Sequence, residues 1–298
     1  MGALFFMLAV GAVARARKVI TDEALDSLCK IVLSVTLPFL FIYVLSTKCN
    51  KEVFLSLWKA PLFAVLIIGV GYVISRILGA LLKLDRKRKN TFTFLISFQN
   101  SGFFAIPIAF ALFGEEGVLT IVIFNLGFNL LYWTLGVWLL SGKDSSGGVN
   151  AIKNLINPGT VALGLGLILG LSSVRVPHLL LDASRILGNA TIPLALLVVG
   201  AILATGKFRQ GGDLKEIFSI VFARLVLIPL IFLSLAKCFG DISPLMRSII
   251  VLQACMPSAS SSPLMAKRFG GDYDLAASGV FFTTLFSIIT IPIFMSLV

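Results

Sequence analysis

The sequence predicts an all-α integral membrane protein in which ten transmembrane helices form two inverted five-helix repeats. Three observations support this fold class. The 298 residues are 58% hydrophobic and 13% charged, with a mean hydropathy of +1.01, which is far too apolar for a soluble domain of this length. Ten apolar segments are long enough, or nearly so, to cross a bilayer. The two halves of the chain also share short motifs at one offset.

The ten segments follow one another with short polar loops between them, since one helical crossing needs about 20 mainly apolar residues. They are residues 1–14, 31–45, 60–82, 91–113, 117–140, 158–174, 186–204, 217–236, 248–266 and 275–298. The first is short, so we expect its helix to be trimmed or to lie partly in the membrane interface. A cleaved signal peptide is not expected, because the basic cluster at 15–18 follows the apolar stretch instead of preceding it.

The distribution of basic residues predicts the orientation. The loops after helices one, three, five, seven and nine carry 15 Lys and Arg residues, whereas the other loops carry seven. By the positive-inside rule the richer loops are cytoplasmic, which places both termini outside. We therefore attribute the net charge of +11 to the cytoplasmic loops of a plasma (inner) membrane protein, and we expect no nucleic-acid partner.

An offset of about 156 residues brings like residues together in the two halves. The matching motifs are Thr36-Leu37-Pro38 with Thr191-Ile192-Pro193, Pro107 with Pro263, and Phe113-Gly114 with Phe269-Gly270. We therefore predict a first repeat at 1–140, a cytoplasmic linker at 141–157 and a second repeat at 158–298. Because five is odd, the second repeat enters the membrane from the opposite side.

Two segments are interrupted by proline and polar residues, at 97–107 (SFQNSGFFAIP) and 253–263 (QACMPSASSSP). Proline removes a backbone donor and clashes with the preceding turn, and lipid offers no replacement partner. Helices four and nine are therefore predicted to break at mid-membrane. Half-helix N-termini that meet there would attract an anion.

The candidate substrate-binding side chains are neutral hydrogen-bonding groups beside the two breaks: Gln99, Asn100, Ser101, Gln253, Ser258, Ser260, Ser261 and Ser262. Asn125 and Asn129 share one face of helix five, which fits either the same cavity or a bond to a neighbouring helix. Pro38, Pro193 and Pro229 are interpreted as simple kinks.

Charged residues are placed differently. All 14 acidic residues lie in loops or near segment ends, which disfavours a proton antiporter built on buried aspartates. No metal site or cofactor is expected, although sodium bound by carbonyls, amides and hydroxyls stays open. Arg224 lies near the middle of helix eight, where a cavity charge, snorkelling and helix pairing are the alternatives. No His, Cys or carboxylate constellation predicts an enzyme.

At these residues the chain resembles the auxin efflux carrier family, which includes plant PIN proteins and many bacterial permeases. The likeness covers essentially the whole chain. It rests on Asn100 with Ile106-Pro107, on Gln253-Ala254-Cys255-Met256-Pro257 leading to Pro263 and Ala266-Lys267-Arg268-Phe269, and on Ser278-Gly279-Val280-Phe281 before Ile291-Pro292. The long hydrophilic loop of many plant members is missing, so the chain looks like a prokaryotic-type, minimal member.

The resemblance implies broken, crossing helices 4 and 9, in a fold related to NhaA and the bile-acid symporters. It implies a dimerising scaffold of residues 1–46 and 158–204, and a transport domain of 58–140 and 214–298. Pro107, Pro257 and Pro263 would mark the crossover, with Asn100 and Gln253 beside it. Family substrates are small organic anions, among them indole-3-acetate and dicarboxylates.

The leading hypothesis is therefore a secondary carrier of a small carboxylate that works by an elevator-like or rocking change and forms a homodimer. A sodium-coupled symporter of the bile-acid type is the alternative within the same structural class. A receptor or a channel is the alternative from other classes.

Overall fold

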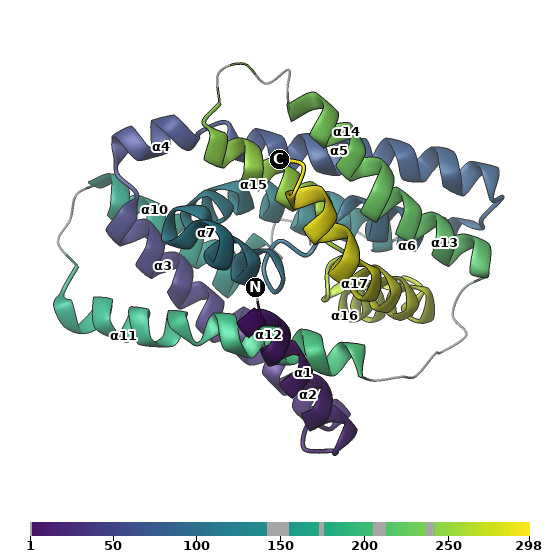
Figure 1. Cartoon of the computed structure of the whole chain (residues 1–298), viewed down its shortest axis with the longest axis horizontal. Coiled ribbons are helices and arrows are strands. Elements are labelled where there is room, and N and C mark those ends of the chain that lie inside the picture. The colour runs from purple at the N-terminus through teal and green to yellow at the C-terminus, as the bar shows by residue number, and fades with distance from the viewer. Residues whose placement is uncertain (1, 142–154, 173–175, 205–212, 237–239, 241) are drawn as a thin grey trace. The chain divides into compact units, whose positions relative to one another are not determined.

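The structure is a computed structural model that describes residues 2–141, 155–172, 176–204, 213–236, 240 and 242–298 (Figure 1). Within these ranges all regular elements are helices. The chain divides into two compact units. Unit 1 is Met1–Pro61, Gly102–Leu126 and Ile156–Gly206, and unit 2 is Leu62–Ser101, Gly127–Leu155 and Lys207–Val298. Residues 142–154 of the predicted linker lie outside the described residues.

Unit 1 contains the first helices of each half of the chain together with the first part of α7. They are α1 (Gly2–Ala16), α2 (Asp22–Ile31), the π-helical turn η1 (Val32–Thr36), α3 (Leu37–Lys48), α4 (Lys51–Leu57), the first part of α7 (Ala105–Leu131), α10 (Pro158–Ser172), α11 (His178–Asn189) and α12 (Thr191–Leu203).

Packing in unit 1 is reciprocal between the two halves of the chain. Helix α1 packs on α12, and α10 packs on α3 (Figure 1). Glycines allow both pairs to approach closely. A Cβ at Gly200 would lie 2.0 Å from the carbonyl oxygen of Leu8, and a Cβ at Gly170 would lie 2.5 Å from that of Leu45. No hydrophobic driving force brings helices together in lipid, so the pairs are stabilised by the close van der Waals packing that small residues allow.

Helix α7 is bent at Gly114, whose φ of 63° and ψ of −151° are non-helical. This left-handed region is open to glycine without the cost that a Cβ brings. A Cβ at Gly117 would lie 3.0 Å from the carbonyl oxygen of Ala109, although residues eight apart in a straight helix are separated by about 12 Å. The chain therefore folds back at Gly114, between the predicted fourth and fifth helices.

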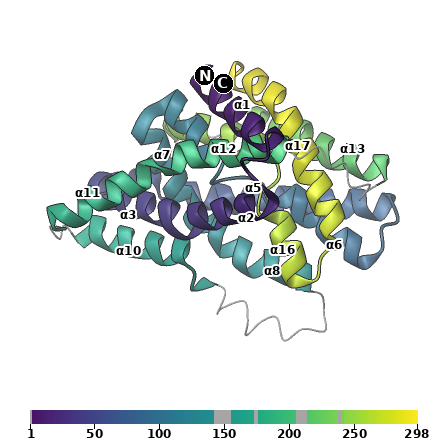
Figure 2. The same ribbon diagram turned by 90° about the horizontal axis from the view of Figure 1, so that it is seen from below.

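Unit 2 holds most of α5 (Ala60–Leu81), α6 (Arg86–Ser97), the end of α7, the π-helical turn η2 (Tyr132–Gly136), α8 (Val137–Ser141), α13 (Leu214–Phe222), the π-helical turn η3 (Ala223–Leu227), α14 (Ile228–Ala236), α15 (Pro244–Cys255), α16 (Ser262–Phe269) and α17 (Tyr273–Met295). Helix α6 is central, because it packs on α8, α13, α16 and α17. Its residues from Thr91 to Ser97 are all buried. Figure 2 shows α8 and α16 side by side.

Two of the π-helical turns end two positions before a proline. Turn η1 precedes Pro38, and η3 precedes Pro229. Proline lacks an N–H group and clashes with the carbonyl four residues earlier, and a wider turn relieves that clash. The kinks expected at these prolines thus take the form of π-helical turns.

Six stretches are long and apolar enough to cross a membrane: Asp22–Lys48, Lys51–Leu81, Ala105–Ser141, His178–Leu203, Leu214–Ala236 and Tyr273–Met295. Shorter apolar helices occupy Phe6–Ala16, Pro158–Ser172 and Pro244–Cys255. The prediction of a multi-pass, all-helical membrane protein is confirmed. The third segment begins at Ala60 as predicted, whereas the second and seventh begin earlier, because polar first turns such as that of α2, capped by Thr21, extend each helix beyond its apolar part.

Candidate functional site

Both predicted helix breaks are present. Helix α6 ends at Ser97 and α7 begins at Ala105, while α15 ends at Cys255 and α16 begins at Ser262. At the second break Ser261 occupies the N-cap of α16, and Pro263 is the second residue of that helix. Pro107 is the third residue of α7, where a missing N–H group removes no intrahelical bond.

The non-helical segments 98–100 and 257–259 pair antiparallel within unit 2. The bridge joins Gln99 to Ser258, both of which are fully buried. Two main-chain hydrogen bonds flank it, from Asn100 N to Pro257 O at 2.8 Å and from Ala259 N to Phe98 O at 3.0 Å. Each break therefore satisfies backbone groups that the other leaves without a helical partner, as a broken helix in a membrane requires.

Predicted polar side chains reinforce this pairing. Asn100 Nδ2 donates to Ser260 Oγ at 2.6 Å. Ser258 Oγ donates to the carbonyl of Leu95 at 2.8 Å, and Ser258 N donates to Thr283 Oγ1 at 3.2 Å. These bonds connect the end of α6, the loop before α16 and helix α17.

An aromatic cluster lies against the same loop. Tyr132 Oη is 2.6 Å from Ser261 Oγ. The Tyr132 ring stacks on Phe128 with centroids 5.4 Å apart and meets Phe98 edge-on at 5.4 Å. Phe94 lies 4.8 Å from Phe98. Such pairs add stability beyond their buried area, so the loop at 260–262 has a rigid wall on one side.

The amides of Gln99 and Gln253 are the unsatisfied groups of the site. Both side chains are fully buried, and neither their Nε2 nor their Oε1 atoms have a hydrogen-bond partner. The hydroxyls of Thr93, Ser97 and Thr284 are also buried without a partner. A buried polar group without a partner costs about 1–3 kcal/mol, so these amides have free hydrogen-bonding capacity that a polar ligand or water can satisfy.

Arg224 binds the C-terminal ends of both interrupted helices. It is fully buried and donates from Nε to Met256 O at 2.8 Å and from one terminal nitrogen to Ile96 O at 3.2 Å. The other terminal nitrogen donates to Gln253 O and Ala254 O, both at 3.1 Å. These contacts are helix pairing, which was one of the roles left open by the sequence.

The positive charge of Arg224 is balanced by the helix ends that it contacts. Helix C-termini carry about −0.5 of an elementary charge each, and α6 and α15 together balance the single positive charge of Arg224. None of the ion pairs among the described residues involves Arg224. The N-terminus of α16, preceded by Ser260 and Ser261, then contributes uncompensated positive potential.

The remaining predicted residues are distributed over both units. Ser101 is buried in unit 2, and Ser262 Oγ donates to Ala259 O at 2.6 Å. Asn129 is half-buried in unit 2, whereas Asn125 and Pro107 are buried in unit 1. A role for Asn125 and Asn129 in substrate binding, and for Pro107 at the crossover, stays a prediction.

Two residues of the site were missed from the sequence. Tyr132 lies three positions after Asn129, so the helical spacing that grouped the two asparagines already contained a signal for it. Thr283 follows the segment Ser278-Gly279-Val280-Phe281. Its hydroxyl accepts from Ser258 N, and no local pattern distinguishes it from a packing threonine.

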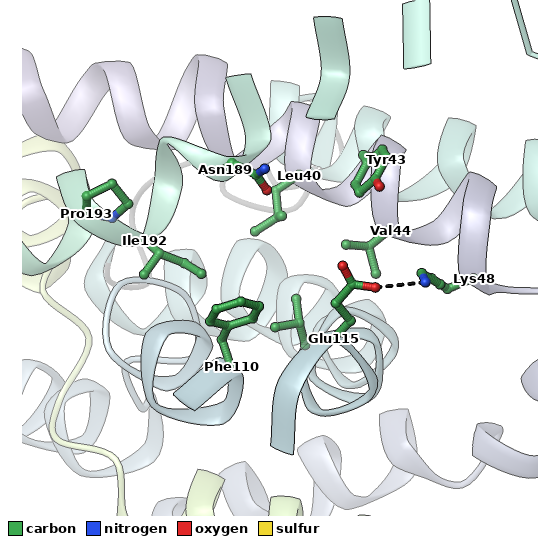
Figure 3. A pocket seen from close by; sticks show the side chains of 10 residues that line it. Leu40, Tyr43, Val44, Lys48, Phe110, Glu115, Asn189, Ile192 and Pro193 are labelled. Atoms are coloured by element: carbon green, nitrogen blue, oxygen red, sulfur yellow. Dashed lines mark ion pairs between the residues drawn. The ribbon is translucent and has the colours of Figure 1, made fainter. Parts of the chain in front are cut away.

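Unit 1 contains a separate cavity of about 320 Å³ between α3, α7 and α12 (Figure 3). Its floor is apolar, with Leu40, Phe110 and Ile192. At one end Lys48 Nζ lies 2.8 Å from Glu115 Oε2. Since this pair has no net charge, the cavity offers no preference for an anion, and none of the predicted site residues lines it.

The sequence is similar to proteins described as transporters. Residues 1–150 and 145–295 match the family described as membrane transport protein. An uncharacterized transporter of Methanocaldococcus jannaschii is 24% identical, over 97% of this chain and 95% of that protein. A putative malonate transporter of Rhizobium meliloti is 23% identical, over 90% and 85%. Protein PIN-LIKES 2 of Arabidopsis thaliana is 27% identical, over 48% of this chain and 35% of that protein.

The family match covers nearly the whole chain, and the helical, multi-pass architecture fits it. The relatives of Methanocaldococcus jannaschii and Rhizobium meliloti are described as transporters and not as enzymes. The chain therefore belongs to the membrane transport protein family, the auxin efflux carrier and PIN-like family that its interrupted helices resemble, and it is a membrane transporter.

Proposed function

We propose that this transporter is a secondary carrier of a small organic anion, bound where the two interrupted helices pair in unit 2. The observation that carries the proposal is the pair of fully buried amides, Gln99 and Gln253, that have no hydrogen-bond partner beside the Gln99–Ser258 bridge. A substrate that bonds to them recovers the free energy that their burial costs. Asn100 and the serines at 258–262 supply further donors.

The sign of the substrate's charge follows from the balance at the break. Arg224 is matched by two helix C-termini, and no carboxylate takes part in the contacts described there. The N-terminus of α16 therefore favours a negative group. The relative described as a putative malonate transporter makes dicarboxylates the first class of substrate to test.

The proposed architecture is ten helices in two inverted repeats, with helices 4 and 9 broken and crossing. It is supported by the chain reversal at Gly114, which separates the fourth and fifth helices. It is also supported by the reciprocal pairs α1–α12 and α3–α10, because a two-fold axis between repeats exchanges such pairs. The predicted repeats at 1–140 and 158–298, the placement of both termini outside and the plasma membrane location belong to the same proposal.

The transport mechanism is proposed to be elevator-like alternating access in a homodimer. The division into two compact units fits a fixed part and a moving part, but residues 102–126 of the predicted transport domain belong to unit 1 together with the scaffold segments. The predicted scaffold (1–46 and 158–204) and transport domain (58–140 and 214–298) remain our assignment of these roles.

The test is uptake by liposomes containing the purified protein. Labelled malonate is the probe, with mono-, di- and aromatic carboxylates as competitors. We expect saturable uptake that excess dicarboxylate inhibits. The absence of uptake and of counterflow for every acid tested would contradict the proposal, and very fast, unsaturable flux would indicate a channel.

Sodium coupling is the second candidate function. The unbonded oxygens of Gln99, Gln253, Ser97 and Thr284 are neutral ligands of the kind that hard cations accept. Replacing sodium with potassium on both sides of the liposome membrane separates the two functions. Unchanged uptake indicates a carrier that does not use sodium, whereas loss of uptake indicates a symporter.

A further inference from the structure

Both π-helical turns of unit 2 deliver a side chain to the paired breaks. Turn η2 begins at Tyr132, which contacts Ser261 on the α16 side. Turn η3 contains Arg224, which contacts the ends of α6 and α15. A π-helical turn adds one residue to the helix and so redirects the side chains within it, and such turns are frequent at functional sites.

The guanidinium of Arg224 suits its position for geometric reasons. Its four hydrogen bonds reach carbonyls at the ends of two different helices. A planar group with five donors can span acceptors in separate elements, whereas an ammonium group concentrates three donors at one point. Lysine would preserve the charge at this site but could not reproduce the bridge.

We propose that Arg224 is the positioning residue of the substrate site. By holding Ile96 O of α6 together with Gln253 O and Ala254 O of α15, it fixes the backbone from which the Gln99 and Gln253 side chains extend. The role of Arg224 toward substrate rests on the proposed function. Its role in holding the ends of α6 and α15 together does not, and it can be measured separately.

Cys255 supplies that readout. It is the last residue of α15, 1% exposed, next to the carbonyls that Arg224 binds. Replacing Cys29, Cys49 and Cys238 with serine leaves Cys255 as the single thiol among the four cysteines of the chain. Its rate of reaction with N-ethylmaleimide in membranes then reports whether the break is closed.

The experiment compares Arg224→Lys and Arg224→Met with Arg76→Met in this single-cysteine background. Arg76 is a matched control, because it also lies within a membrane-length helix of unit 2 but bonds to Asn90 Oδ1 at 3.3 Å, away from the break. We expect labelling of Cys255 to accelerate about tenfold or more in Arg224→Met, as expected for loss of a charge-assisted hydrogen bond. Arg224→Lys should be intermediate, and Arg76→Met should be unchanged.

Transport kinetics provide the second arm. Arg224→Lys retains the charge but loses the hydrogen bonds that bridge the two helix ends. We therefore expect the KM for a transported anion to rise about tenfold while the maximal rate changes less. Arg76→Met should leave the KM unchanged. If the parent protein moves none of the acids tested, the proposed function fails, but the labelling of Cys255 still decides the role of Arg224.

Two results would overturn the inference. One is labelling of Cys255 at the parent rate in both Arg224 variants. The other is failure of both variants to give a monodisperse protein, because Arg224 would then be needed for folding of the whole unit and not for the geometry of the break. If Arg224→Met alone fails to fold, Arg224→Lys carries the test.

Discussion

Asn100 and Ser260, 160 positions apart in the chain, are joined by a hydrogen bond of 2.6 Å between Nδ2 and Oγ. Asn100 also donates its backbone N–H to Pro257 O. Asn100, which follows the end of α6 at Ser97, is thus bonded through both its main chain and its side chain to the loop that precedes α16. The amide of Asn100 keeps its oxygen for a further contact.

This link predicts the behaviour of Asn100→Ala. Removing the amide takes away a donor to Ser260 and a candidate contact to substrate, so we expect the KM for uptake to rise about tenfold while the protein stays folded. A cycle with Ser260→Ala measures the coupling between the two side chains. Asn90→Ala is the matched control, because Asn90 lies in the same helix as the first break but bonds to Arg76. Equal kinetics for Asn100→Ala and Asn90→Ala would contradict the site.

Gln253→Leu should separate stability from transport. The buried Gln253 amide has no partner, so an apolar side chain of similar size removes a cost of about 1–3 kcal/mol. We expect a higher midpoint of thermal unfolding together with loss of uptake, as in other sites that hold unpaired polar groups for function. Circular dichroism on heating and liposome uptake check the two parts. A lower midpoint would show that the amide already has a stabilising partner.

Tyr132→Phe tests the hydroxyl that contacts Ser261. The ring and its stacking with Phe128 are retained, and one hydrogen bond is lost. That loss corresponds to about 0.5–1.5 kcal/mol of stability, so we expect a small fall in thermal stability. Because the loop at 260–262 loses a restraint, we also expect a rise in KM of about three- to tenfold. Tyr132→Ala should in addition destabilise the protein by about 3–5 kcal/mol, the cost of emptying a buried aromatic site. Identical KM values for the parent and Tyr132→Phe would assign the hydroxyl no role.

Gly200→Ala tests the contact between α1 and α12. The new Cβ would lie 2.0 Å from the carbonyl oxygen of Leu8, so the helices must separate. We expect a marked fall in thermal stability and in the yield of monodisperse protein. Gly164→Ala is the control, because a Cβ there meets no atom within 4 Å, and alanine at such a helical position is neutral or slightly stabilising. Equal stability of the two variants would show that the close approach is not required.

The sequence predicted both breaks because their causes are local. A proline with amides and serines in an apolar segment leaves backbone groups that lipid cannot satisfy, and the structure interrupts the helices at 98–104 and 256–261. The side chains of Asn100 and Ser260 join the two segments directly, Ser258 bonds to Leu95 of α6, and Ser261 bonds to Tyr132. Whether they bind substrate is what the uptake experiments decide.

Other features depend on contacts that a sequence does not display. Arg224 had three open roles, and only its position beside four carbonyls shows that it pairs helix ends. Tyr132 contacts the break because a π-helical turn begins at this residue. Unlike η1 and η3, that turn is not followed by a proline from which it could be predicted. Helix boundaries were misplaced where amphipathic turns, such as the one beginning at Asp22, extend apolar cores.

The antiparallel bridge between Gln99 and Ser258 also constrains how the protein is made. A ribosome releases residue 99 long before residue 258, so the first interrupted segment enters the bilayer while its hydrogen-bond acceptors do not yet exist. Its freed amides must meanwhile stay in contact with water or the insertion machinery. The backbone hydrogen bonds of the first interrupted segment can therefore form only after the second half of the chain has been synthesised. A chain truncated before residue 257 should remain a target for quality-control proteolysis.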